Sequence, residues 1–284
     1  MSVTTAEKRA AFRRLHDQGC FVIPNPWDIG SARYLQHLGF KALATTSSGA
    51  AWTQGLGDNG LGLEGVLAHI GEIAAASDIP LNADFEGGYA VEPAGVAANV
   101  KRAIDTGVSG LSIEDSTGRS DEPLFDFALS VERIKAARAA IDQSGSGVML
   151  TARAECFLVG HPDPLKESIR RLEAYAAAGA DCLYAPGPKS RGHIETIVKA
   201  VAPKPVNLLV GAPGLSVAEI AAMGVRRISV GGALARAAWT GFFQTAKEIA
   251  EKGTFAGFGG IVAFGEIDGL FAADSKKRAK AKDR

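Results

Sequence analysis

The chain has 284 residues, of which 46% are hydrophobic and 22% charged, and its 31 acidic residues equal its basic residues in number. This balance argues against nucleic acid or an anionic membrane as a general partner, and no uninterrupted apolar run of 18 residues predicts a membrane span. The N-terminal residues lack the apolar segment of a signal peptide, and the three cysteines fit no zinc spacing, so we expect a cytoplasmic protein with reduced thiols.

Short β-rich runs alternate with helical segments along the whole sequence. Eight runs are mostly apolar, as expected for parallel strands covered by helices: 20–23, 42–46, 79–84, 110–115, 148–153, 182–185, 205–209 and 227–231. Between them, apolar residues recur at helical spacing, as do Val66, Ile70 and Ile73. Eight such units predict an α/β fold, a (β/α)8 TIM-type barrel. An open doubly wound sheet is the alternative, although no GxGxxG follows the first run.

The chain is predicted to divide into the barrel, residues 1–253, and a C-terminal helical extension, residues 254–284. Gly39, Gly107, Gly179 and Gly224 stand where predicted helices end before strands, a position that glycine favours. The last segment, DSKKRAKAKDR, has six cations in eleven residues and predicts a disordered basic tail.

Carboxylates end two neighbouring predicted strands, Asp84 on the third and Glu114 on the fourth. In a barrel these ends form the active-site mouth, where two like charges need a cation between them. Oxygen ligands without histidine or cysteine at zinc spacing favour Mg²⁺, with Mn²⁺ possible. Arg153, which ends the fifth strand, is the alternative counter-charge, and its guanidinium also suits a grip on a substrate carboxylate.

The segment Ser47-Ser48-Gly49-Ala50 follows the second strand. Its small residues and backbone N–H groups suit a cradle for a carboxylate, although an ordinary tight turn explains it equally well. Two loops are candidate lids: residues 51–62, which bring Asp58 toward the mouth, and residues 116–128. No histidine ends a predicted strand, so a histidine base is not expected.

Several motifs together resemble the isocitrate lyase/phosphoenolpyruvate mutase superfamily. They are ADFEGGYA on the third strand, SIEDS on the fourth, TARAE on the fifth, PVN on the seventh and the Ser-Gly turn after the second. The resemblance runs from PNPWDIGSARYLQHLGFKALATTSSGAA to VRRISVGGALARAA. It implies a cytoplasmic homotetramer, a dimer of dimers whose C-terminal helices are exchanged between subunits.

The resemblance also implies roles for individual residues. Asp84 matches the direct Mg²⁺ ligand, while Glu114 and Asp58 match carboxylates that hold the metal mostly through water, and Glu86 is a further candidate. The substrate-binding candidates lie on the second, fifth and seventh strands: Ser48, Gly49, Ala50, Arg153 and Asn207. The candidate catalytic residues are Arg153, Asp58 and Glu114.

The sequence departs from the superfamily pattern at four places. Asn82 stands where a first acid of the metal motif is expected, which leaves Glu86 or Asp58 to supply the missing charge. The loop STGRSDEPLFDF lacks the catalytic cysteine of isocitrate and methylisocitrate lyases. Ser112 replaces a histidine of those lyases, and Pro186 replaces the Glu or His expected after the sixth strand.

These observations predict a Mg²⁺-dependent lyase or decarboxylase that acts on a C–C bond next to the carbonyl of a small 2-oxo or 2-hydroxy dicarboxylate, through an enolate. Cleavage of isocitrate is not expected without the cysteine. One alternative is a C–P bond enzyme, a phosphonopyruvate hydrolase or a phosphoenolpyruvate or carboxyphosphonoenolpyruvate mutase. Another is a non-catalytic 2-oxo acid binding protein.

Overall fold

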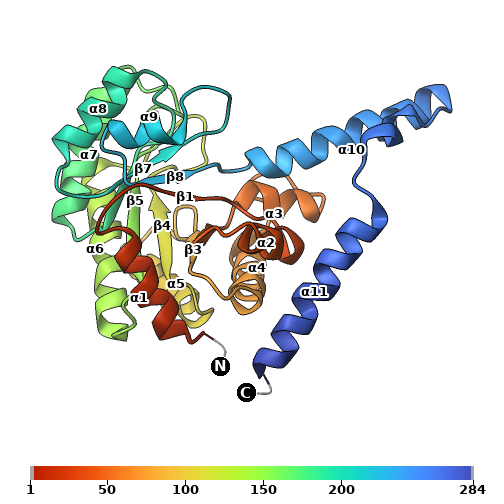
Figure 1. Cartoon of the computed structure of the whole chain (residues 1–284). Helices are drawn as coiled ribbons and strands as arrows, with labels where there is room; N and C mark the ends of the chain where they lie inside the picture. Colours follow the sequence, from red (N-terminus) through yellow and green to blue (C-terminus); the bar gives the residue numbers. More distant parts are fainter. Residues whose placement is uncertain (1–2, 283–284) are drawn as a thin grey trace.

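Eight parallel strands form the centre of the computed structural model, which describes residues 3–282 (Figure 1). They are β1 (Phe21–Ile23), β2 (Leu43–Ala44), β3 (Leu81–Asp84), β4 (Gly110–Glu114), β5 (Met149–Arg153), β6 (Cys182–Tyr184), β7 (Val206–Leu209) and β8 (Arg227–Ser229). Each lies inside its predicted range, which confirms all eight predicted strands. The observed strands are shorter because ladder hydrogen bonds stop where the chain turns into the loops.

The sheet closes into a barrel, which confirms the predicted fold and makes the open-sheet alternative wrong. The strand order is β1-β8-β7-β6-β5-β4-β3-β2, so the first strand pairs with the last. The Ala44 backbone N–H donates to the Pro24 carbonyl at 3.0 Å and so links β2 to the end of β1. Closure removes the free sheet edges and brings the C-terminal ends of all the strands to one mouth.

Helices alternate with the strands, and those before residue 233 surround the barrel (Figure 1). They are α1 (Thr5–Leu15), α2 (Ile29–His37), α3 (Ser47–Thr53), α4 (Gly62–Ala76), α5 (Pro93–Asp105), α6 (Phe127–Ser144), α7 (Pro164–Ala177), α8 (Arg191–Ala200), α9 (Val217–Ala222), α10 (Ala233–Lys252), the 3₁₀ helix η1 (Ala256–Gly260) and α11 (Phe264–Lys282). The predicted helix-ending glycines Gly39, Gly107, Gly179 and Gly224 all have positive φ, between 85° and 98°. Such backbone angles strain any residue with a Cβ, which explains glycine there.

The apolar core lies between the barrel strands and the surrounding helices. Ile70 and Ile73 of α4 pack with Leu81 and Leu111 in this layer, and all four side chains are buried. The predicted helical face of α4 is thereby confirmed. Such packing fixes the strands rigidly and so fixes the positions of the polar side chains at the mouth.

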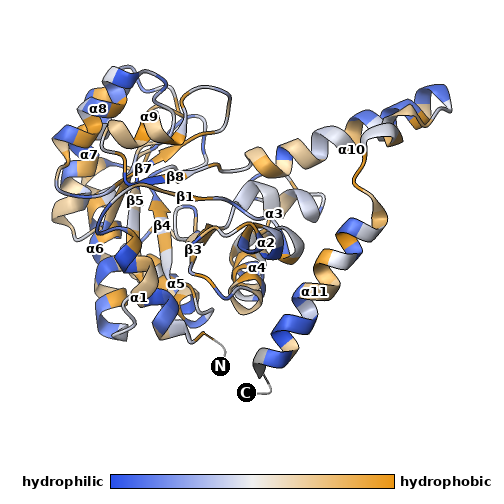
Figure 2. Ribbon diagram, in the orientation of Figure 1, coloured by the Kyte–Doolittle hydropathy of each residue, from blue (hydrophilic) through white to orange (hydrophobic). Residues whose placement is uncertain are grey.

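The C-terminal segment leaves the barrel. Helix α10 projects outward as an arm, and η1 and α11 follow it (Figure 1). Only Ala235 of α10 is buried, although the helix lies within the predicted barrel, residues 1–253. Apolar residues are therefore exposed along the arm (Figure 2), among them Phe242, Phe243, Phe255 and Phe264.

Helix α11 continues through the segment predicted as a basic tail as far as Lys282. Alanine, lysine and arginine favour helix, and two ion pairs involve Asp274, one to α2 and one within α11. Arg33 of α2 donates to the Asp274 carboxylate through its Nε at 2.9 Å, and Arg278 donates to the same carboxylate at 3.0 Å. Residues 283–284 of the predicted tail lie outside the described residues.

Candidate active site

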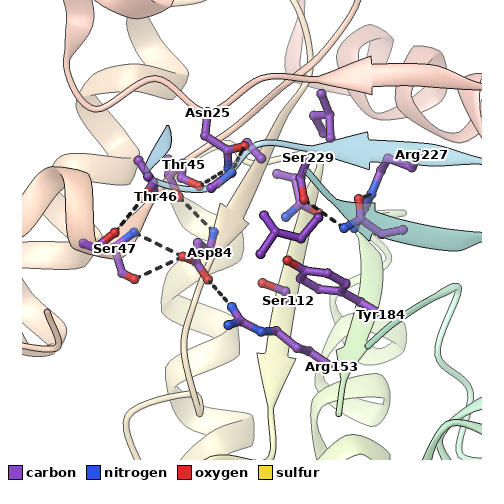
Figure 3. A pocket seen from close by; sticks show the side chains of 18 of the residues that line it. Asn25, Thr45, Thr46, Ser47, Asp84, Ser112, Arg153, Tyr184, Arg227 and Ser229 are labelled. Atoms are coloured by element: carbon purple, nitrogen blue, oxygen red, sulfur yellow. Dashed lines mark hydrogen bonds and ion pairs between the residues drawn. The ribbon is translucent and has the colours of Figure 1, made fainter. Parts of the chain in front are cut away.

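A polar pocket of about 170 Å³ opens at the C-terminal ends of the strands (Figure 3). All eight strands contribute to its wall, as the closed barrel requires. The side chains that matter for its chemistry come from the strands and their ends, from the start of α3 and from the loop between α3 and α4: Asn25, Ser47, Ser48, Asp58, Asn82, Asp84, Ser112, Arg153, Tyr184, Asn207, Arg227 and Ser229. Polar groups that lie far apart in the sequence therefore share one cavity.

Asp84 is held in a fixed orientation at the end of β3. Its Oδ2 accepts hydrogen bonds from the Ser47 backbone N–H and the Ser47 hydroxyl, both at 3.1 Å. Its own backbone N–H donates to the Thr45 hydroxyl at 2.8 Å. The N-terminal end of α3 thus stabilises the carboxylate through both N–H donation and the helix dipole.

Among the described residues that line this side of the pocket, Arg153 is the only cation, and it contacts three carboxylates. Its Nη1 lies 3.0 Å from Glu114 Oε2 and 3.6 Å from Asp84 Oδ1, and its Nε donates to Glu155. Strand register produces the arrangement, because Glu114 of β4 lies directly opposite Arg153 of β5. The expected role of Arg153 as a counter-charge therefore corresponds to an observed contact.

Carboxyl groups outnumber cations in this cluster. Burial, together with the neighbouring carboxylates Asp84 and Asp58, raises the pKa of Glu86 to about 7. Burial also raises the pKa of Glu114 to about 8, with Glu155 and Asp84 adding to the rise and Arg153 opposing it. Five carboxyl groups, at Asp58, Asp84, Glu86, Glu114 and Glu155, outnumber the one guanidinium of Arg153, so the cluster favours protonation of Glu86 and Glu114 unless a further cation binds.

A hard divalent cation fits this donor set, but only with few protein ligands. No group of three or more His, Cys, Asp or Glu side chains is close enough to share a metal within residues 3–282. Mg²⁺ commonly keeps several waters and uses one or two carboxylates plus substrate oxygens. Asp84 on the pocket wall suits such a site as the direct ligand, whereas a cage formed jointly by Asp84, Glu86, Glu114 and Asp58 does not match the geometry.

The expected N–H cradle after β2 is instead the first turn of α3. Thr46 is the N-cap, and its hydroxyl accepts from the Gly49 backbone N–H at 3.3 Å. The Ala50 N–H donates to the Thr46 carbonyl at 3.0 Å. Gly49 and Ala50 are buried away from the pocket, so among the three predicted cradle residues only Ser48 lines it. The segment is therefore a helix N-terminus and not an ordinary tight turn, and its role as a substrate cradle stays a prediction.

The opposite wall of the pocket is a neutral hydrogen-bond network around one arginine. Asn207 accepts from Arg227 Nε at 2.8 Å through its Oδ1 and donates to the Ser229 hydroxyl at 2.9 Å. Arg227 Nη2 donates to the Thr151 hydroxyl at 3.1 Å. Tyr184 lies beside them, and burial raises the pKa of its phenol to about 12, so it remains a protonated donor.

The structure brings together most, but not all, of the predicted site residues. Ser48, Asp58, Asp84, Arg153 and Asn207 line the pocket, whereas Gly49, Ala50, Glu86 and Glu114 do not. Glu86 has a left-handed backbone, with φ of 44°. Glu114 lies behind Arg153, where it holds the guanidinium.

Sequence reasoning missed Asn25, Tyr184 and Arg227 as pocket residues. One signal existed for Arg227, because alternate residues of a strand share a face and Ser229 lies two positions later. No sequence signal pointed to Asn25, since its role arises only when the barrel closes. Its amide donates to the Thr45 carbonyl and accepts from the backbone N–H groups of Val230 and Gly231, at 2.8 and 2.9 Å.

The positions that depart from the superfamily pattern also have defined places. Asn82 and Ser112 line the pocket, and Pro186 does not. The Asn82 amide donates to the Ala83 carbonyl, and its buried Oδ1 has no hydrogen-bond partner. The loop after β4 folds on itself through a bridge between Ser116 and Leu124.

Known proteins match this chain over most of its length. The sequence model of phosphoenolpyruvate phosphomutase matches residues 12–250. The uncharacterized protein MT2054 of Mycobacterium tuberculosis (strain CDC 1551 / Oshkosh) is 32% identical over 78% of this chain and 81% of its own. The oxaloacetate decarboxylase of Paraburkholderia xenovorans (strain LB400) is 28% identical over 85% of this chain and 78% of its own.

Solved structures agree with the barrel. A Burkholderia cenocepacia J2315 protein of provisional lyase/mutase assignment is 45% identical, with a TM-score of 0.91, over 94% of this chain and 97% of its own. Oxaloacetate acetylhydrolase in complex with the inhibitor 3,3-difluorooxalacetate is 25% identical, with a TM-score of 0.84, over 99% of this chain and 98% of that one.

The barrel and its mouth define a TIM-type enzyme site with carboxylates at adjacent strand ends. The chain belongs to the phosphoenolpyruvate phosphomutase family, within the isocitrate lyase/phosphoenolpyruvate mutase superfamily, as the sequence motifs predicted. Its named relatives are lyases, decarboxylases and mutases, and it is an enzyme of that type. Residues 3–282 include no helix long and apolar enough to cross a membrane.

Proposed function

We propose that this enzyme is a Mg²⁺-dependent lyase or decarboxylase that breaks a C–C bond next to the carbonyl of a small 2-oxo or 2-hydroxy dicarboxylate, by way of an enolate. The observation that carries the proposal is the unbalanced carboxylate cluster beside Asp84, in a pocket whose opposite wall donates hydrogen bonds. The first wall suits a divalent cation, and the second suits an anionic substrate.

In this proposal Asp84 holds the metal ion, which when bound supplies positive charge to stabilise the enolate oxygen. Ser47 orients the Asp84 carboxylate through its N–H and hydroxyl groups. Arg153, fixed by Glu114 and Glu155, presents its guanidinium to the substrate carboxylate. Asp58, exposed at the mouth, is assigned the exchange of a proton between the third carbon and solvent.

The test is turnover by the purified full chain with Mg²⁺ on a panel of 2-oxo and 2-hydroxy dicarboxylates, with release of a 2-oxo acid as the readout. We expect turnover of at least one acid, its loss in EDTA and its return with excess Mg²⁺. Exchange of the methyl protons of pyruvate in D₂O is a second readout of enolate formation. No product from any acid, together with no exchange, would contradict the proposal.

A C–P bond enzyme is the second candidate, favoured by the match to the phosphoenolpyruvate phosphomutase sequence model. A phosphonopyruvate hydrolase releases inorganic phosphate from phosphonopyruvate, whereas a mutase converts it to phosphoenolpyruvate. Phosphorus NMR of the same Mg²⁺ reaction distinguishes these products from unreacted substrate. Faster turnover of phosphonopyruvate than of every dicarboxylate would replace the first proposal with this one.

We also propose that the arm of α10, η1 and α11 packs on other copies of the chain in a homotetramer, as the resemblance to the superfamily implies. Its exposed phenylalanines support this, since Phe242, Phe243 and Phe264 are 59%, 61% and 84% exposed. Light scattering on the full chain should give four times the 29.5 kDa subunit mass. The double variant F242E/F243E should lower that mass, and a monomeric wild type would contradict the assembly.

A further inference from the structure

Arg227 is a buried charge without a carboxylate partner. Its side chain is 3% exposed, and no ion pair involving it exists between the residues from 3 to 282. Its partners are the amide of Asn207, the hydroxyl of Thr151 and, at 3.4 Å, the ring of His16. Burial, with Arg227 as the next cause, lowers the pKa of His16 to about 3, so that ring is neutral near pH 7.

Other buried arginines of the chain are compensated. Arg33 pairs with Asp274 and Asp78, and Arg171 pairs with Asp115 and Glu167. Arg133 has no carboxylate, but it donates to the backbone carbonyls of Gly87, Ala90 and Val91 and does not line the pocket. Arg227 has only neutral side-chain partners and faces a cavity. A buried guanidinium in such a place is stabilised most by an anion that enters the cavity.

The position of Arg227 is also informative. Asp84 and Ser47 lie on one side of the pocket and Arg227 on the other, with Ser112 and Tyr184 between them (Figure 3). The strand order places β8 well away from β3 around the barrel. A molecule whose 2-oxo carboxylate lies at Asp84 therefore extends its far end toward Arg227.

We propose that Arg227 binds the second carboxylate of the substrate, the one farthest from the 2-oxo or 2-hydroxy group, and makes the enzyme selective for dicarboxylates over 2-oxo monocarboxylates. This assignment rests on the proposed function, which puts the other end of the substrate at Asp84. Asn207 holds the Arg227 Nε in place, and the hydroxyls of Ser229 and Tyr184 supply further donors at the same wall. Arg227 is thus the specificity-determining residue of the pocket.

Calorimetric binding of two ligands in Mg²⁺ tests the assignment. The compound 3,3-difluorooxaloacetate carries both carboxylates, whereas pyruvate lacks the second one. We expect R227M to weaken difluorooxaloacetate binding at least about 30-fold, the cost of removing one partner of a buried charge pair. Pyruvate binding should change by less than about threefold, because a ligand without the second carboxylate makes no ion pair with Arg227.

Two further variants keep the result interpretable. R227Q retains a donor toward Asn207, and it replaces R227M if that variant does not fold. We expect R227Q to show the same loss of difluorooxaloacetate affinity. The control R14M, at an exposed position of α1, should change the affinity for neither ligand. Equal losses for both ligands, or an unchanged difluorooxaloacetate affinity, would overturn the assignment.

The wild type and a third ligand separate the remaining outcomes. A wild type that binds neither ligand would overturn the proposed function and this assignment with it. If the wild type binds pyruvate but R227M leaves the difluorooxaloacetate affinity unchanged, only the assignment of Arg227 is overturned. Phosphonopyruvate carries a phosphonate in place of the second carboxylate, and tighter Arg227-dependent binding of it than of difluorooxaloacetate would replace the carboxylate assignment with a phosphonate one.

Discussion

The two walls of the pocket differ in how they hold charge. On the Asp84 wall, carboxylates from β3, β4 and β5 crowd around the single guanidinium of Arg153. On the Arg227 wall, one guanidinium is surrounded by neutral groups. The first wall lacks positive charge and the second lacks negative charge. A divalent cation together with a dianionic acid would complement both, and this complementarity teaches more about the ligand than either wall alone.

The largest effect is expected from D84N, which removes the charge that holds the metal. Activity should fall at least about 10³-fold, because the stabilising charge on the enolate oxygen is lost with the ion. Initial rates across a Mg²⁺ titration measure this. D17N, an Asp-to-Asn change at an exposed turn, is the matched control and should leave the rate unchanged. Near-normal activity of D84N at low Mg²⁺ would contradict the proposal that Asp84 binds the metal.

The next effect concerns the ion-pair network. R153M should destabilise the fold by about 3–5 kcal/mol, because Glu114 and Glu155 are left buried without a partner. Urea unfolding measures the change. Adding E114Q should recover part of the loss, since a neutral amide needs no counter-charge. If the losses in the free energy of unfolding caused by R153M and E114Q are additive, the ion pair of Arg153 and Glu114 does not stabilise this wall.

A smaller effect is expected from S47A, which keeps the backbone donor to Asp84 but removes the hydroxyl donor. The Mg²⁺ concentration for half-maximal activity should rise about 10-fold, as for other residues that orient a metal ligand. The saturated rate should change less than this. S144A, at an exposed helix end, serves as the comparison. An unchanged Mg²⁺ requirement would show that the N–H alone orients Asp84.

A further effect belongs to the Arg227 wall and appears as pH dependence of stability. Burial and Arg227 lower the pKa of His16 to about 3, whereas an unfolded histidine titrates near 6.5. Below about pH 6.5 the unfolded chain therefore binds a proton at His16 that the folded chain does not. The stability of the folded state consequently decreases as the pH is lowered. The His16 contribution between pH 7 and pH 5 is about 2 kcal/mol.

Urea unfolding of H16Q at both pH values should lack this part of the pH dependence. The variant H37Q, at an exposed position, should retain it. Identical pH profiles for the wild type and H16Q would mean that water or an anion already compensates the Arg227 charge in the free enzyme.

Sequence reasoning performed well where local pattern and barrel geometry act together. The alternation of eight apolar runs with helices predicted the closed barrel, and acids at strand ends predicted the mouth, because parallel strands all end on one side. It did not predict the helix that begins after Thr46, or that α11, with Asp274 paired to Arg33, extends through the basic segment to Lys282. In both cases a single capping or ion-pair contact decided the local structure, and such contacts leave little trace in periodicity.

The sequence by itself determined the barrel, the family and the candidates Asp84, Arg153 and Asn207, because strand period and strand ends are local properties. Only the tertiary structure decided that Glu114 holds Arg153 instead of lining the pocket, and that Arg227 reaches the cavity without a carboxylate beside it. Charge balance in a buried site depends on which strands lie opposite one another. That pairing exists only after the barrel closes and water is excluded.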